Sequence, residues 1–230
     1  MKNGRIGEVE ELFTYLLETR LRPDGYAWLK DNVSELHTTA ELKQLNRIFA
    51  QVPRYTSKEL LGWKDKAIHD LRVLIPGYDL SDWTVETFCR VWLLMQLPSR
   101  NQEAYVSAIE RLFVGAEMNE LVALYKAFPL LQYPDHWIGR CEEGIRSNIG
   151  NVLEAIMYHN PYPAGHLSEA AWNQMILKAF FTDKDVTKIF GLQERVNPAL
   201  QATLADYVQE RIAAGRSVNP EIYKLMEVKK

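Results

Sequence analysis

The sequence predicts an all-α protein, and three observations carry this prediction. Apolar residues recur three and four positions apart along most of the 230 residues. No long alternating run of Val, Ile or Thr bounded by hairpin turns occurs. The breaks between apolar stretches carry Pro, Gly or residues that can cap a helix. We therefore expect stacked antiparallel helices in an α-solenoid-like arrangement; because no fixed repeat is visible, a compact multi-helix bundle is the alternative.

The N-terminal half carries helix-start signals at regular intervals. Asp24 can cap a helix, and the spacing of Thr38–Glu41 and of Thr56–Glu59 matches capping boxes, in which a Thr and a Glu three residues apart satisfy each other's backbone amides. We expect the first two helices over 6–19 and 25–35, and a third that begins at 38–41. A fourth helix should run from 56–59 to 74, and a fifth from Ser81 or Asp82 to Leu97. A sixth should run from 99–102 to Val114, and a seventh should end before Pro129.

The C-terminal half is expected to contain fewer but longer helices. The pattern predicts its longest helix over 139–159, followed by a rigid extended corner at 160–163, where two prolines remove backbone donors. Further helices are expected over 168–181 and 198–214, with Gly215 closing the second, and a last short helix from Asn219–Pro220.

Composition indicates an ordinary globular protein. Hydrophobic residues make up 47% of the chain and charged residues 25%. The chain has 30 acidic and 27 basic side chains, so it has no excess of positive charge that could neutralise a phosphate backbone. We therefore expect no nucleic-acid partner. No apolar stretch approaches the roughly 20 residues of a transmembrane helix, and the charged start does not resemble a signal peptide. We expect one cytoplasmic all-α domain over 1–230; a boundary within 129–134 is the alternative.

Sequence motifs of catalysis and metal binding are absent. The chain lacks the common hydrolase, dinucleotide, P-loop and zinc signatures. His136, His159 and His166 have no metal-ligand spacing. Cys89 and Cys141 are far apart in sequence, and we expect both to be free thiols. The residues therefore predict no catalytic set, no metal and no cofactor.

Polar side chains are dense within the apolar helices between residues 140 and 216. Glu143 and Arg146 share one predicted helix face, and Asp206 and Glu210 form a like-charge pair one turn apart. Such residues can hold helices together or form a ligand site, because partly buried polar groups need partners in either case.

This C-terminal stretch resembles the EboA family. The resemblance rests on the sequence segments 140–148, 154–156, 160–164, 172–179 and 206–216, so the EboA-like part covers 135–230. It implies a metabolite traffic protein that functions beside other Ebo proteins, including a prenyltransferase-like membrane protein, through which it would associate with a membrane. Since no catalytic motif occurs, we expect a non-catalytic accessory protein that binds a metabolite or scaffolds pathway proteins. The alternative is an unusual enzyme for a membrane-derived or glycosylated precursor, using Lys178, Glu143 or Asp206.

The resemblance and the double-proline corner together predict where a ligand would bind. The corner brings the end of one helix beside the start of the next, so polar residues on both should share partners. Within this group we expect Asn173 and Lys178 to contact ligand, and Glu143 with Arg146 to brace the helices. The candidate ligand-binding residues, expected to converge with Glu143, are Arg146, Asn160, Tyr162, Trp172, Asn173, Lys178 and Arg195.

Overall fold

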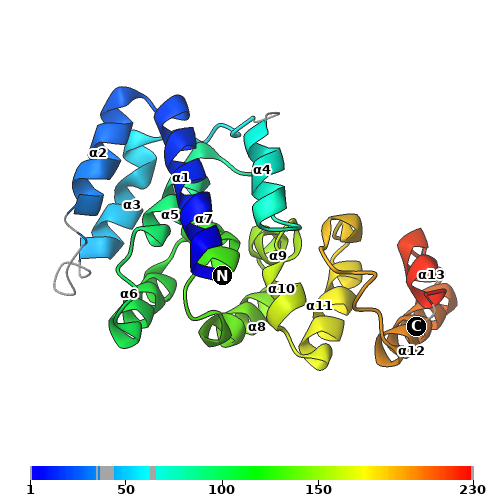
Figure 1. The fold of residues 1–230 in the computed structure, drawn as a ribbon. Helices are drawn as coiled ribbons and strands as arrows, with labels where there is room; N and C mark the ends of the chain where they lie inside the picture. The colour runs from blue at the N-terminus through cyan, green and yellow to red at the C-terminus, as the bar shows by residue number, and fades with distance from the viewer. Residues whose placement is uncertain (1, 35, 37–43, 63–65, 229–230) are drawn as a thin grey trace.

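The computed structural model describes residues 2–34, 36, 44–62 and 66–228, and the regular elements among them are helical (Figure 1). The predicted all-α class is confirmed. The described residues also include the short 3₁₀ turns η2 (Phe128–Leu130), η3 (Pro134–Trp137) and η4 (Val186–Lys188). The α-helices are α1 (Lys2–Arg20), α2 (Pro23–Ser34), α3 (Leu45–Tyr55), α4 (Lys66–Leu74), α5 (Val85–Met95), α6 (Gln102–Gly115), α7 (Met118–Lys126), α8 (Ile138–Arg146), α9 (Gly150–Met157), α10 (Tyr162–His166), α11 (Glu169–Phe181), α12 (Pro198–Ala213) and α13 (Pro220–Met226).

Helix α5 is the central element of the N-terminal part. It packs against α1, α3 and α7, and α7 in turn packs against α9. All residues from Val85 to Leu94 are buried. A helix covered on every side is expected to be apolar all round, and α5 follows this rule apart from Glu86, Thr87 and Arg90. These three polar residues therefore need partners inside the protein.

The helices form a compact arrangement. In a solenoid each unit contacts its sequence neighbours, whereas here α1 contacts α4 and α5, and α3 contacts α5 and α6. The N-terminal part thus corresponds to the multi-helix bundle that the sequence left as the alternative. Helices α11, α12 and α13 instead follow one another toward the C-terminal end, on the right of Figure 1. The single-domain organisation stays a prediction.

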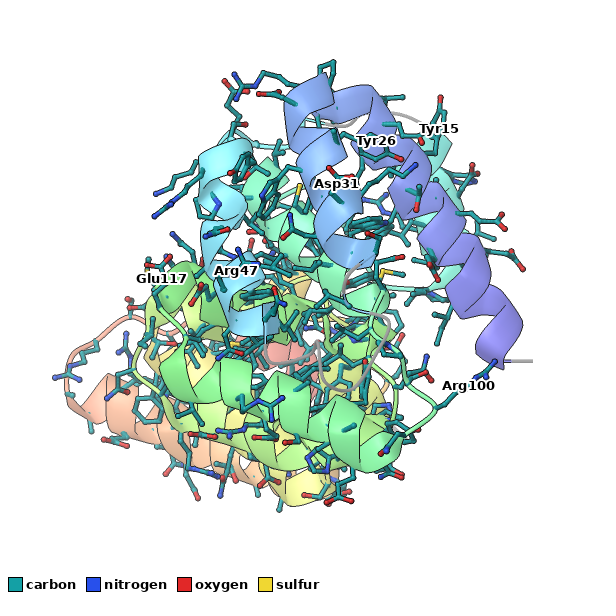
Figure 2. All side chains as sticks on the ribbon, turned by 90° about the vertical axis from the view of Figure 1, so that its left-hand side faces the viewer. Tyr15, Tyr26, Asp31, Arg47, Arg100 and Glu117 are labelled. Atoms are coloured by element: carbon teal, nitrogen blue, oxygen red, sulfur yellow. The ribbon has the colours of Figure 1, made fainter. Side chains whose placement is uncertain are left out.

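Exposed side chains cover the side of the molecule that lies on the left of Figure 1, beside α2, α3 and α6. Figure 2 looks at this side and shows Tyr15, Asp31, Arg47 and Arg100 on its surface. All four residues are exposed. This side of the molecule therefore presents a solvated surface.

The predicted capping box at 56–59 does not begin a helix. Thr56 follows the last residue of α3, and its hydroxyl donates to the Val52 carbonyl at 2.9 Å. The carbonyls of Ser57 and Glu59 accept the amides of Glu86 and Val85, both at 3.0 Å. This segment therefore satisfies the first amides of α5 instead of forming its own helical turn. The other predicted box, at 38–41, lies outside the described residues.

Two other predicted caps are placed differently in the structure. Thr84, rather than Ser81 or Asp82, caps α5 by accepting the Thr87 amide. Asp24 lies in the first turn of α2 instead of before it. Ser168 and Asn197 cap α11 and α12, in agreement with the expected starts of those helices.

The helix predicted over 139–159 is two helices, α8 and α9, which are separated at 147–149. Ser147 ends α8 because its backbone is extended, with ψ 157°, and its carbonyl accepts the ammonium group of Lys178 at 2.7 Å. The two helices pack closely at Gly144, where an added Cβ would lie 2.5 Å from the Ile156 side chain and 2.6 Å from the Tyr125 ring. Ile149, expected in the apolar stripe, is exposed.

The predicted extended corner at 160–163 is also different in the structure. Pro161 has helical dihedral angles, and Tyr162 begins the short helix α10. The chain reverses one residue earlier, at His159, whose φ of 51° is left-handed. The His159 amide donates to the Lys188 carbonyl at 2.9 Å, and its carbonyl accepts the Asp79 amide at 3.3 Å. Prolines suit the first turn of a helix because amides there have no intrahelical acceptor.

The close approach at Gly144 leads to a paired prediction. Gly144→Ala should lower the free energy of unfolding by about 1–3 kcal/mol, because the added methyl group overpacks the α8–α9 contact. Gly139→Ala, in the same helix, meets no atom within 4 Å and should be neutral or raise it by up to about 1 kcal/mol. Urea titrations of both variants measure the difference; equal effects would contradict this role of Gly144.

Candidate functional site

The structure divides the predicted ligand-binding residues among separate places, and most of their polar groups bind other residues. Arg195 and Trp172 do meet: the guanidinium lies 4.7 Å from the centre of the indole ring. Arg195 also donates to the carbonyls of Pro163 at 3.0 Å, Ala164 at 3.2 Å and Leu167 at 2.9 Å. These carbonyls lie in α10 and just after it, so Arg195 caps the end of that helix.

Asn173 forms a closed amide pair with Asn197. The Asn173 amide nitrogen donates to the Asn197 oxygen at 3.0 Å, and the Asn197 nitrogen donates to the Asn173 oxygen at 2.8 Å. The Asn197 oxygen also accepts the Leu200 amide, which caps α12. The pair therefore joins α11 to the start of α12.

Asn160 and Tyr162 point into the core toward α7 and η3. The Asn160 side chain donates to the carbonyls of Tyr125 and Ala155, and its oxygen accepts the Tyr162 amide at 3.1 Å. The Tyr162 hydroxyl donates to the Pro134 carbonyl at 2.6 Å, and burial raises the pKa of this hydroxyl. Both side chains hold the turn after His159 in place.

The expected pairing of Glu143 with Arg146 is wrong. Glu143 binds Arg140 at 2.7 Å, and Arg140 also binds Glu110 of α6. Arg140 faces α6 and lies one turn before Glu143, so it takes the carboxylate that Arg146 was expected to bind. The Arg146 side chain is 68% exposed and lies 3.9 Å from Glu142.

Lys178 does not join these residues into one cluster. Its ammonium group binds the Ser147 carbonyl and, at 3.4 Å, the Asn148 side chain. A cavity of about 210 Å³ between α8 and α11 is lined by Arg146 and Gln174, but not by Asn173 or Lys178. Ligand binding by the predicted residues stays a prediction. Asn160, Tyr162, Asn173, Lys178 and Arg195 have intramolecular hydrogen-bond partners, whereas the buried indole nitrogen of Trp172 has none in the described part of the chain.

The main group of buried charged residues lies between α5, α7 and α9, which are neighbours in the fold (Figure 1). Two members of this group, Glu86 and Lys126, line a cavity of about 220 Å³, which we call the α5–α7–α9 cavity. Most of the residues that line it are polar, and they include charges of both signs. The lining residues are Lys58, Asp82, Thr84, Glu86, Thr87, Asn119, Val122, Lys126, Asn151, Glu154 and Ala155.

Lys126 is the buried cation of the α5–α7–α9 cavity. Its side chain is 7% exposed, and its ammonium group binds the Asp82 carboxylate at 2.8 Å and lies 5.4 Å from the Trp83 ring. Burial lowers the pKa of Lys126 below the ordinary lysine value, although Asp82 opposes this shift. An ammonium group has three donors, and within the described residues only the bond to Asp82 is made. Its other N–H groups have no hydrogen-bond acceptor in the part of the chain that the structure describes.

Glu86 is the buried anion of the same cavity and is neutralised from behind by Arg90. The Arg90 guanidinium is fully buried, pairs with Glu86 and donates to the Phe49 carbonyl of α3 at 3.2 Å. Its remaining nitrogen lies 3.7 Å from Glu120 and 3.9 Å from Glu117, both at the start of α7. Arg90 thus joins α3, α5 and α7 while it compensates the charge on the cavity wall.

Hydroxyl, amide and carboxylate groups complete the lining. The hydroxyls of Thr84 and Thr87 are 2.9 Å apart, and Glu154 is held by Lys184 at 2.6 Å. Asn119 and Lys58 make no side-chain hydrogen bond to the described part of the chain. The cavity therefore offers donors and acceptors to a polar ligand.

None of the predicted ligand-binding residues lines this cavity. The available signal was the presence of Glu86 and Arg90 inside the apolar stretch 85–94, and of Lys126 inside the apolar stretch 121–128. Charged residues are seldom fully buried unless they are paired, so their presence in such stretches indicates an internal polar cluster. Sequence alone does not show that α5, α7 and α9 are neighbours.

The cysteines agree with the expectation of free thiols. Cys89 and Cys141 are both buried and unpaired, and burial raises the pKa of each thiol. Among the described residues, no group of three or more His, Cys, Asp or Glu side chains is arranged so that it could hold a metal ion. Within that same part of the chain, no helix is long and apolar enough to cross a bilayer.

The buried Glu86–Arg90 pair predicts a large effect on stability. Glu86→Ala should lower the free energy of unfolding by about 3–5 kcal/mol, because it leaves the Arg90 charge buried and poorly compensated. Glu142→Ala, which removes a carboxylate 3.9 Å from the exposed Arg146, should change it by less than about 1 kcal/mol. Urea denaturation measures both variants, and a small effect of Glu86→Ala would show that the pair does not support the core.

The lowered pKa of Lys126 predicts a pH dependence with a defined sign. Just below pH 10.5, the ordinary lysine value, the unfolded chain binds more protons at this residue than the folded protein does. The contribution of Lys126 to the free energy of unfolding should therefore rise with pH in that interval. We expect the free energy of unfolding of the native protein, minus that of Lys126→Met, to increase as pH rises through this interval. A difference that is constant or falls would contradict the lowered pKa.

Comparison with known proteins places the chain in a family. Comparisons with curated proteins and with solved structures give no significant match. The family model described as metabolite traffic protein EboA matches residues 9–227, and so extends far beyond the C-terminal part that carries the clearest sequence resemblance. Because this match covers nearly the whole 230-residue sequence, the chain belongs to the EboA family of metabolite traffic proteins.

Proposed function

We propose that this protein binds a small polar metabolite in the α5–α7–α9 cavity and acts as a non-catalytic accessory protein in metabolite traffic. One observation carries the proposal: the buried Lys126 lines a cavity whose lining residues are mostly polar, and within the described part of the chain it makes one hydrogen bond, to Asp82, which leaves its other N–H groups without an acceptor there. A buried donor without an acceptor is unfavourable, so a ligand or water must satisfy these groups. The family description supports a metabolite as the ligand.

The size and polarity of the cavity restrict the class of ligand. A volume of about 220 Å³ is below the range of roughly 300–1,000 Å³ that is typical of sites for drug-sized molecules. Lys126 and Glu86 would lose favourable interactions beside a hydrocarbon chain, because charged groups are costly to bury without polar partners. A compact molecule with several hydroxyl or carbonyl oxygens fits these walls better than a lipid tail does.

The charged groups also support binding without catalysis of a net reaction. Asp82 is paired with Lys126, Glu86 with Arg90, and Glu154 with Lys184. Paired groups of this kind hold and orient a polar molecule, and the sequence carries none of the common hydrolase, dinucleotide or P-loop motifs. We propose that the bound molecule passes to other Ebo pathway proteins, as the resemblance implies.

Identification of a co-purifying molecule tests this function. The protein is purified from its native cells and denatured, and the released small molecules are compared by mass spectrometry with those from two variants. Asn151→Trp places a large ring at the edge of the α5–α7–α9 cavity, whereas Gln174→Trp does the same at the α8–α11 cavity. Both positions are exposed, so both variants should fold.

We expect a molecule that the native protein and Gln174→Trp retain and that Asn151→Trp loses. Retention by Asn151→Trp together with loss by Gln174→Trp would move the site to the α8–α11 cavity. Recovery of other pathway proteins with no small molecule would instead indicate a scaffold.

A further inference from the structure

We propose that Lys126 captures a carbonyl group, forming a reversible imine with an aldehyde or ketone in the α5–α7–α9 cavity. This inference rests on the proposed function, because it concerns the same cavity and specifies how the ligand is held. Its chemical class is a small hydroxylated aldehyde or ketone. The argument depends on the position of the Lys126 amine, its surroundings and the group that exchanges protons with it.

The position of Lys126 is fixed by its own backbone. Its carbonyl accepts the hydroxyl of the fully buried Tyr78 at 2.5 Å, and its side chain runs beside the Trp83 ring. The other lysine in the cavity lining, Lys58, is exposed and makes no hydrogen bond to the described residues. A carbonyl group in the cavity would therefore meet one positioned amine, that of Lys126.

The surroundings of Lys126 favour its nucleophilic form. An amine attacks a carbonyl carbon only when it is neutral, and burial favours the neutral form of a lysine. The side chain is 7% exposed, and burial is the largest influence on its pKa, which is lowered despite the nearby carboxylates of Asp82, Glu154 and Asp79. Lys184 holds Glu154 and Arg72 pairs with Asp79, so these two carboxylates are partly neutralised by other cations.

Asp82 is placed to move the protons that imine formation requires. The ammonium group of Lys126 gives a proton to the Asp82 carboxylate at 2.8 Å, and the neutral nitrogen then adds its electron pair to the carbonyl carbon. A proton moves from nitrogen to the former carbonyl oxygen, which gives a carbinolamine. Asp82 returns its proton to that hydroxyl, water leaves, and the nitrogen lone pair forms the C=N bond of a protonated imine. The net change consumes one carbonyl group and releases one water, with no oxidant or reductant.

The remaining lining suits the rest of such a molecule. The Thr84 and Thr87 hydroxyls and the Asn119 amide provide donors and acceptors for hydroxyl groups next to the carbonyl. Asp82 would pair with the protonated imine as it pairs with the ammonium group. The covalent bond is reversible by hydrolysis, so it is compatible with a protein that holds a metabolite and later releases it.

Reductive trapping tests the inference. The folded protein is treated briefly with limiting glycolaldehyde and sodium cyanoborohydride, which converts an imine into a stable amine, and labelled lysines are located by peptide mass spectrometry. We expect labelling of Lys126 to be faster than that of Lys58, because burial lowers the pKa of Lys126 and so raises the neutral fraction of its amine. Unfolding in urea should abolish this preference. Lys126→Arg should remove the label from position 126 while thermal unfolding shows a folded protein.

The outcomes separate this inference from the proposed function. Labelling of Lys126 that is no faster than that of Lys58 overturns imine formation. If Asn151→Trp still loses the co-purifying molecule in that case, non-covalent binding in the cavity stands. Selective labelling of Lys126 without any cavity-dependent molecule supports the reactivity of the lysine and overturns the proposed function.

Discussion

The buried guanidinium of Arg90 is the constraint around which the N-terminal part of the protein is organised. A fully buried cation is tolerated only where anions and hydrogen-bond acceptors surround it. Here the Phe49 carbonyl of α3 and Glu86 of α5 itself accept its hydrogen bonds, and the carboxylates of Glu120 and Glu117 at the start of α7 lie 3.7 and 3.9 Å from its third nitrogen. The relative placement of these helices is therefore linked to one charge, in addition to the apolar packing around α5.

The α5–α7–α9 cavity is a consequence of this arrangement. Glu86 pairs with Arg90 on one side and lines the cavity on the other, while α7 brings Lys126 to the opposite wall and α9 adds Glu154. The interactions that fix the core thus also fix the polar lining of the cavity. A cavity lined mostly by polar residues is consistent with the description of the EboA family as metabolite traffic proteins.

The polar residues of the C-terminal part have a different role in the structure. Arg195 binds the carbonyls at the end of α10, Asn173 and Asn197 join α11 to α12, and Lys178 binds the carbonyl that separates α8 from α9. Each of these residues satisfies backbone groups at a helix end or joins two helices. The sequence segments that resemble the EboA family most clearly therefore contain residues that hold the helix ends together.

The sequence by itself determined the all-α class and the approximate positions of most helices, including the starts of α11 and α12, because helical periodicity depends on residues close together in the chain. Tertiary structure decided the rest. Ser57 and Glu59 bind the start of α5 instead of beginning a helix, and the helix predicted over 139–159 is divided at Ser147, where Lys178 binds. The α5–α7–α9 cavity belongs to this second group, since Asp82, Lys126 and Glu154 are far apart in sequence and become neighbours only when their helices pack. Local sequence patterns carry no information about such long-range partners. These partners bind the same backbone and side-chain groups that a local turn or cap would otherwise use.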